Sequence, residues 1–228
     1  MMKRLHRLCG AALLALGGLL GHGAALAIEE PVFDVIEKSG QLELRQYKPT
    51  LIAETLVDGD LDAASNRGFR LIADFIFGNN TAPRTGDAGG RIAMTAPVTA
   101  QPASEKIAMT APVLVEPQDR ADPDALARAV RWRIQFAMPA QYTMATLPRP
   151  NNPAVVVREL PGRRVAAVVF SGLAGEDRVR EATRDLLAWM DSRGLKAAGA
   201  AQLARYNPPW TLPFWRRNEV LVEVEAPR

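Results

Sequence analysis

The chain has 228 residues, 48% of them hydrophobic, and its 28 basic and 25 acidic residues give a formal net charge of +3. Its one cysteine, Cys9, and its two histidines, His6 and His22, all lie within the first 27 residues. Residues 28–228 therefore cannot form a disulfide, a thiol nucleophile, a Ser-His-Asp triad or a metal site that uses histidine or cysteine.

The first 27 residues have the organisation of a secretory signal peptide. A basic start, an apolar core and a small-residue cleavage site follow one another: Lys3, Arg4 and Arg7, then residues 11–20, then Ala25-Leu26-Ala27. We expect cleavage after Ala27, so that the mature protein starts at Ile28, is periplasmic or secreted, and keeps no stable membrane anchor. An uncleaved anchor is the alternative, because the apolar run 8–27 is just long enough to cross a bilayer core of ~30 Å.

Cleavage would also change the charge of the protein. The 25 remaining Lys and Arg residues balance the 25 Asp and Glu residues, so the mature chain carries no formal net charge. The basic character of the full chain therefore comes from the signal peptide. A nucleic-acid partner loses its main electrostatic support, and we expect none.

The first part of the mature chain predicts three strands and a helix. Residues 33–47 alternate on both sides of a Gly-containing turn, which indicates a hairpin, and residues 50–57 indicate a third strand. From 61 to 77, apolar residues recur at helical spacing, with Asp60 as the expected N-cap. Gly78-Asn79-Asn80 is expected to end this helix.

The heptapeptide IAMTAPV occurs twice, at residues 92–98 and 107–113. In each copy Ile, Met, Ala and Val fall on alternate positions, which predicts two similar antiparallel strands that line one core. The proline of each copy has no backbone N–H to donate to a neighbouring strand, so each strand is expected to end, bulge or become an edge there. For Met94 and Met109, core packing is favoured over the lining of an apolar ligand site.

The second part of the chain repeats this order of elements. Strands are expected at 132–139, 154–160 and 163–172, then a helix at 176–194, then strands at 203–207 and 216–225. We therefore predict the fold class α+β, a distorted antiparallel β-barrel or sheet from a duplicated β-β-β-α-β-β unit with two main helices packed on it. The pseudo-symmetric halves are expected at about 33–115 and 131–225, within one domain of residues 28–228.

Five stretches of the sequence resemble the SOUL haem-binding protein family. They are IAMTAPV, PTLIAET (49–55), FAMP (136–139), FSG (170–172) and ARYNPPWTLPFWRRNEV (204–220). The resemblance runs from about Phe33 to Glu223. It implies a distorted β-barrel of two pseudo-symmetric halves with two helices. It also implies a shallow surface cleft for haem or another tetrapyrrole, between the helix at 61–77 and the loop at 207–218.

The resemblance also assigns the residues that would line this cleft. They are Asn66, Phe69, Arg70 and Ala73 on the helix, with Arg67 beside them, and Trp210, Thr211, Leu212 and Phe214 in the loop, with Arg216 and Arg217 next to them. The family places basic residues where haem propionates are neutralised, whereas Asn66 and Asp74 stand at two of the helix positions where a cation is expected. The arginines of the helix and the loop would then have to compensate.

The mature chain departs from one branch of the family in the ligand of the haem iron. That branch holds the iron through a histidine, and residues 28–228 have none. A methionine, Tyr206, or stacking without any ligand remain as alternatives. The expected cofactor is haem or another tetrapyrrole, and no metal-binding residue is assigned.

The aromatic loop has a second interpretation. The stretch NPPWTLPFWRR offers three rings and two arginines, as a flat ligand with carboxylates at its rim requires. Alternatively, Trp210, Phe214 and Trp215 plug the core, and Arg216 and Arg217 pair with nearby acids. On the helix, an amphipathic stripe is expected in the core: Phe69, Ile72, Phe75 and Ile76.

No acid/base constellation indicates an enzyme, and Ser171 lacks both a Gly-x-Ser-x-Gly elbow and a histidine base. Our leading hypothesis is an exported, non-enzymatic protein that binds haem or a related tetrapyrrole reversibly, for buffering, transport or sensing. The first alternative is an envelope protein-interaction or structural module that has lost haem binding. The second is a binder of another hydrophobic small molecule, because the halves resemble small-molecule-sensing domains of multidrug regulators at the level of fold.

Overall fold

The computed structural model describes residues 29–83, 104–118, 125–127, 129–208 and 210–226. Their elements are, in chain order, β1 (Phe33–Ser39), β2 (Leu42–Tyr47), β3 (Thr50–Asp58), α1 (Leu61–Ile76), β4 (Asn80–Thr81), β5 (Val113–Pro117), η1 (Ala125–Ala127), β6 (Arg131–Ala137), β7 (Arg149–Pro150), β8 (Val156–Leu160), β9 (Arg163–Ser171), α2 (Glu176–Asp191), β10 (Gln202–Arg205), η2 (Pro213–Trp215) and β11 (Arg217–Glu223). Within these ranges, neither helix has the length and apolar character that a membrane span needs.

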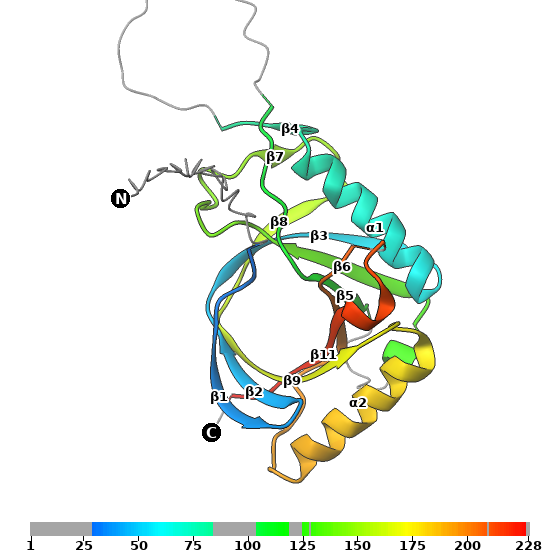
Figure 1. The fold of residues 1–228 in the computed structure, drawn as a ribbon. Helices are drawn as coiled ribbons and strands as arrows, with labels where there is room; N and C mark the ends of the chain where they lie inside the picture. Colours follow the sequence, from blue (N-terminus) through cyan, green and yellow to red (C-terminus); the bar gives the residue numbers. More distant parts are fainter. Residues whose placement is uncertain (1–28, 84–103, 119–124, 128, 209, 227–228) are drawn as a thin grey trace, which may run out of the picture.

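Nine strands form one antiparallel sheet, which curls into a half-barrel (Figure 1). Their order is β1-β2-β9-β11-β10-β5-β6-β3-β8, while β4 and β7 form a separate pair. Both α1 and α2 lie against the outer face of the half-barrel (Figure 1). The predicted α+β class, with a curled antiparallel sheet and two packed helices, is confirmed.

The order of the strands is symmetric, apart from the edge strand β1. The set β2, β3, α1, β5 and β6 corresponds to the set β8, β9, α2, β10 and β11. The first strand of each set pairs with a strand of the other set: β2 pairs with β9, and β8 pairs with β3. The repeat boundaries therefore differ from the expected ones. The strand expected to open the second half, β6, pairs with β3 and β5 and completes the first half.

The helices and the outer face of the sheet enclose the main core. Each helix buries one stripe: Leu61, Ala64, Ile72, Phe75 and Ile76 on α1, and Val179, Ala182, Leu186, Trp189 and Met190 on α2. α1 approaches β6 closely at Gly68, where an added Cβ atom would lie 2.7 Å from the Cβ atom of Ile134. This close approach explains a glycine in the middle of a helix.

The ends of α1 follow from local chemistry. Asp60 caps the helix as predicted, because its side chain accepts a hydrogen bond of 2.8 Å from the backbone N–H of Ala63. The helix ends at Ile76, one residue before the predicted end, and Gly78 takes a φ of +123° just beyond it. Glycine adopts such a conformation without steric strain, so the predicted stop is confirmed.

The repeated heptapeptide behaves differently from the prediction. Its first copy, with Met94, lies outside the described residues. In the second copy the strand begins only at Val113, so the predicted strand is wrong for residues 107–112. Their backbone donors go elsewhere, since Ile107 N donates to the end of α1 and Ala111 N donates to the segment before β1. Met109 packs against the core, as favoured from the sequence.

Candidate functional site

The exposed face of α1 carries most of the predicted helix residues. Asn66, Arg67 and Arg70 are exposed. Phe69 keeps 37% of its surface exposed, while its ring contacts Phe136 of β6 at a centroid distance of 5.6 Å. Phe69 therefore takes part in both the core and the surface, which neither sequence interpretation anticipated.

Two helix positions differ from their expected roles. Ala73 is only 6% exposed, because it lies beside the buried stripe that includes Ile72 and Ile76. The expectation that Ala73 faces a ligand is therefore corrected to a core position. Arg67 donates from Nη1 to the carbonyl oxygen of Asp58 at 3.2 Å, which holds its guanidinium over the turn between β3 and α1.

The loop 206–216 carries exposed aromatic side chains. Trp210 is 82% exposed, and Leu212, Phe214 and Trp215 are exposed as well. Phe214 and Trp215 contact each other edge to face, with centroids 5.0 Å apart. The alternative in which these rings plug the core is wrong.

Hydrogen bonds join several described residues of the loop. Backbone bonds of 3.0 Å run from Thr211 N to Pro208 O and from Trp215 N to Leu212 O. The side chain of Arg216 donates from Nε to Thr211 O at 2.8 Å. Hydrogen bonds of this kind reduce the entropy that the loop would lose when a ligand binds.

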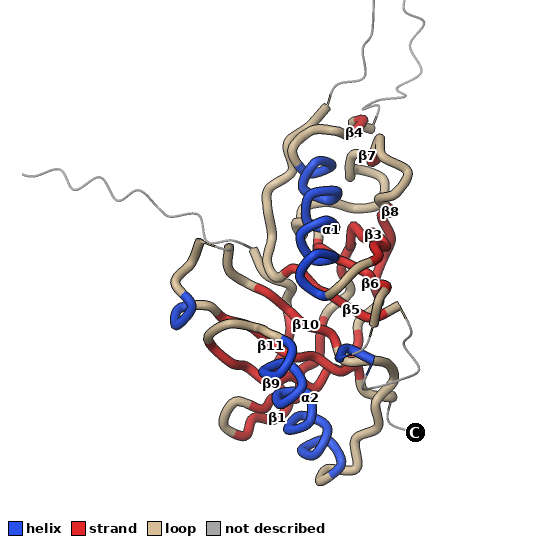
Figure 2. Tube along the Cα trace, turned by 90° about the vertical axis from the view of Figure 1, so that its right-hand side faces the viewer, coloured by secondary structure: helices blue, strands red, loops and turns tan. Residues whose placement is uncertain are grey.

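The base of the loop is tied to the first turn of α1. Arg205, at the end of β10, donates from Nη2 to Asp62 Oδ1 at 2.6 Å and to the carbonyl oxygen of Ala174 at 3.3 Å. Figure 2 shows the segment between β10 and β11 projecting from the sheet, apart from α1. The predicted helix and loop are thus neighbours at the base of the loop, and its aromatic tip stands away from the helix.

The far end of the loop joins a buried network on the inner face of the sheet. Glu219, which has no exposed surface, accepts hydrogen bonds from Arg217 Nη2 (2.8 Å) and from the hydroxyl of Tyr206 (2.9 Å). It also accepts from both terminal nitrogens of Arg45, at 2.6 and 3.1 Å. Arg217 pairs with Glu30 as well, at 3.1 Å. Two carboxylates thus share the charge of Arg217, which matches the alternative of pairing with nearby acids.

This network shifts the pKa values of its members. Burial acts to raise the pKa of Glu219, but the hydrogen bonds and charges of Arg45 and Arg217 outweigh burial and hold this pKa below its ordinary value. Burial raises the pKa of the Tyr206 hydroxyl, and the neighbouring carboxylate of Glu219 raises it further. Sequence analysis did not single out this network, since its only signal is charged residues at alternate positions of apolar strands.

Acidic pH should destabilise the protein, because three glutamate carboxylates have lowered pKa values in the folded state. Burial acts to raise the pKa of Glu43, Glu54 and Glu219, but hydrogen bonds from paired cations outweigh it and hold each pKa below the ordinary 4.5. A lowered pKa contributes stability that is present above pH 4.5 and is lost as the pH falls through the folded-state pKa. Urea denaturation should therefore give a free energy of unfolding that declines from about pH 5 to about pH 3. Equal values at both pH values would contradict this account.

Few of the side chains that usually bind haem iron occur among the described residues. Histidine and cysteine are absent from residues 28–228. The hydroxyl of Tyr206 already donates to Glu219, and its raised pKa disfavours the phenolate form. Met138 and Met190 are buried in the core. In the described ranges, no group of three His, Cys, Asp or Glu side chains could hold a metal ion. Of the side chains that usually hold haem iron, the described residues therefore contain only methionine and tyrosine.

Comparison with known families decides what kind of protein carries this site. The model of the family described as SOUL heme-binding protein matches residues 28–104 and 99–223. The chain belongs to the SOUL heme-binding protein family. No curated protein matches the sequence of this SOUL protein significantly.

Solved structures share the fold of this SOUL protein. The crystal structure of the EcmrR C-terminal domain is 12% identical with a TM-score of 0.55, over 81% of this chain and 97% of that one. EcmrR in its DNA complex is 12% identical with a TM-score of 0.51, over 81% and 57% of the two chains. An uncharacterized conserved protein from Listeria innocua is 11% identical with a TM-score of 0.50, over 81% and 92%. At these identities the likeness is one of fold alone.

Proposed function

We propose that this SOUL protein binds haem or a related tetrapyrrole reversibly, on the surface that the loop 206–216 forms with the exposed face of α1, which adjoins the base of the loop. The observation that carries the proposal is the exposure of Trp210, Phe214 and Trp215 on one loop. Large exposed apolar patches mark interaction sites, because a soluble protein otherwise covers them. Phe69 on α1 supplies an apolar surface on the helix side.

The arginines around this surface suit the propionates of the ligand. Arg67 and Arg70 are exposed on α1, and Arg216 follows the aromatic tip of the loop. Asp62 and Asp74 on the same helix offset part of this charge. We therefore expect stacking and burial of the ring to contribute more to affinity than the ion pairs.

The role that we propose is non-enzymatic: buffering, transport or sensing of the tetrapyrrole in the periplasm or outside the cell, after cleavage behind Ala27. A bound haem supplies redox-active iron, whereas the residues of this chain bind and orient the ring. Because residues 28–228 contain no histidine or cysteine, affinity should depend little on the metal. Zinc protoporphyrin and metal-free protoporphyrin should then bind within about threefold of haemin.

The site is tested by titrating residues 28–228 with haemin and following the Soret band. Trp210→Ala and Phe69→Asp should each weaken binding by at least about tenfold, ~1.4 kcal/mol, because they remove one of the two apolar surfaces. Phe77→Ala is the matched control, since Phe77 is an exposed ring at the opposite end of α1. It should leave the affinity unchanged, and thermal unfolding checks that all variants are folded.

Two outcomes would contradict the proposal. A Soret shift that Trp210→Ala leaves unchanged would place the ligand elsewhere. Absence of any shift up to about 100 μM haemin would mean a binding free energy weaker than roughly −5.5 kcal/mol. The second outcome would favour the alternative of an envelope protein-interaction module, which the same exposed loop supports.

A further inference from the structure

A cavity lies between the segment that precedes β1 and the ends of β3, β6 and β8. Its volume is about 730 Å³, within the range of pockets that hold drug-sized molecules, roughly 300–1,000 Å³. Residues of four segments surround it, namely 29–32, 48–51, 137–143 and 159–161, together with Thr110. None of them belongs to α1 or to the loop 206–216, so the cavity is separate from the proposed tetrapyrrole site.

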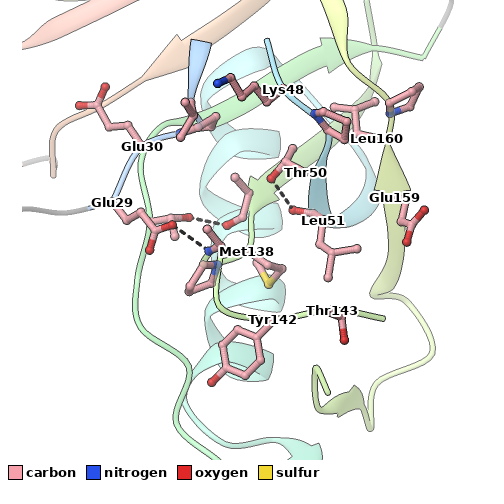
Figure 3. A pocket seen from close by; sticks show the side chains of 18 residues that line it. Glu29, Glu30, Lys48, Thr50, Leu51, Met138, Tyr142, Thr143, Glu159 and Leu160 are labelled. Carbon is pink, nitrogen blue, oxygen red and sulfur yellow. Dashed lines mark hydrogen bonds between the residues drawn. The ribbon is translucent and has the colours of Figure 1, made fainter. Parts of the chain in front are cut away.

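The segment 29–32 is fixed across the cavity by hydrogen bonds. The Glu29 carboxylate accepts from Ala140 N at 2.7 Å, and the carbonyl oxygen of Val32 accepts from Lys48 N at 3.0 Å. In Figure 3 Glu29 lies on one side of the cavity and Glu159 on the other. Hydrogen-bonded chain therefore bounds the cavity on both sides.

The walls of the cavity are mainly apolar and stiff. The apolar lining residues are Pro31, Val32, Pro49, Leu51, Ala137, Met138, Pro139, Ala140, Leu160 and Pro161. Four of these are prolines, and because proline fixes its own φ, the wall positions lose little entropy when a ligand binds. Met138 adds a polarizable thioether that adapts to an irregular apolar surface. Such walls suit the apolar body of a ligand.

The charged groups at the rim are mostly acidic. Three glutamates, Glu29, Glu30 and Glu159, and one lysine, Lys48, line the cavity. Glu30 is paired with Arg217. The Lys48 ammonium lies 3.9 Å from the carboxylate of Asp34. The carboxylates of Glu29 and Glu159 are thus left in excess, so the rim favours a positive ligand and repels propionates such as those of haem.

We propose that this cavity is a second binding site, which takes an amphiphile with an apolar body and one positive charge. The apolar walls hold the body, and Glu29 and Glu159 select the charge. The two sites of this protein then prefer opposite charges, because arginines flank the aromatic loop and glutamates flank this cavity. The proposal does not depend on tetrapyrrole binding at the loop.

Two dyes with the same xanthene body and opposite charge test the proposal. Fluorescence anisotropy of the cation rhodamine 6G should show saturable binding to residues 28–228 at one equivalent, with a Kd below about 100 μM. The anion fluorescein should bind at least about tenfold more weakly. Equal affinity for the two dyes, or no binding of rhodamine 6G, would overturn the proposal.

A pair of neighbouring substitutions locates the bound cation. Thr143 lines the cavity and is exposed, so Thr143→Arg should place a positive charge at its rim without disturbing the core. It should weaken rhodamine 6G binding by at least about tenfold. Met144→Arg adds the same charge one residue away, at an exposed position outside the lining, and should leave binding unchanged. Equal effects of both variants, or loss of binding in Trp210→Ala, would place the dye elsewhere and overturn the proposal.

Discussion

Replacement of Glu219 by Gln should lower the free energy of unfolding by about 3–5 kcal/mol. Glu219 is fully buried, and it accepts hydrogen bonds from both terminal nitrogens of Arg45, a side chain that is itself only 1% exposed. The amide removes the negative charge and leaves the Arg45 guanidinium in the interior with Glu43 as its remaining acid partner. A buried charge that has lost its main partner is far more destabilising than a lost surface pair.

Thermal unfolding followed by circular dichroism measures this effect as a fall in the midpoint on the order of 10 °C. Glu181→Gln is the matched control, because Glu181 pairs with Arg178 on the exposed surface of α2. It should change the free energy by less than about 1 kcal/mol. The account of the network is wrong if the two substitutions have similar effects. The double variant Arg45→Met/Glu219→Leu should lose less free energy of unfolding than the single variants Arg45→Met and Glu219→Leu lose in sum.

Gly68→Ala should destabilise the protein by about 1–3 kcal/mol, although the same change in most helices stabilises by about 1 kcal/mol. The added Cβ atom would lie 2.7 Å from the Cβ atom of Ile134, and Ile134 is fully buried in β6. Neither the strand nor the helix can move away without disturbing the core that both enclose. The steric effect therefore outweighs the gain in helix propensity.

Urea denaturation of three variants tests the contact between Gly68 and Ile134. The variants are Gly68→Ala, Asn66→Ala and the double variant Gly68→Ala/Ile134→Ala. Asn66 is exposed on the same helix, so Asn66→Ala should be neutral or slightly stabilising, by up to about 0.5 kcal/mol. The double variant should lose less free energy of unfolding than the two single variants lose in sum. The alanine at position 134 makes room for the new methyl group at position 68. An increase in stability on Gly68→Ala would show that the helix does not approach β6 so closely.

The elements that sequence analysis placed correctly are those with a strong local signal. The helix α1 combines apolar residues at helical spacing with the Asp60 cap, and both features are present in the structure. Strand alternation located most of the sheet in the same way. Residues 107–112 misled the prediction, because Ile107 and Ala111 are buried in irregular chain, and burial at alternate positions does not require a strand.

The features that sequence analysis missed depend on contacts between distant residues. Charged residues such as Glu43 and Arg45 alternate with apolar ones in β2, a pattern that usually indicates a solvent-facing side. The sheet curls instead, and both side chains are buried on its inner face. The composition of the loop 206–216 is compatible both with aromatic side chains buried in the core and with aromatic side chains exposed on the surface. Only the structure shows that Trp210, Phe214 and Trp215 are exposed.

The exchange of strands between the two halves has a consequence for the order of folding. β2 pairs with β1 in a local hairpin, but it joins the rest of the sheet only through β9, whereas β8, the partner of β3, precedes β9 in the chain. A nascent chain that ends before β9 can therefore form the β1-β2 hairpin and the run β5-β6-β3-β8, but it cannot join them. The pairings that unite these two parts become available only when β9, β10 and β11 have been synthesised, so contacts between residues far apart in the sequence complete the fold.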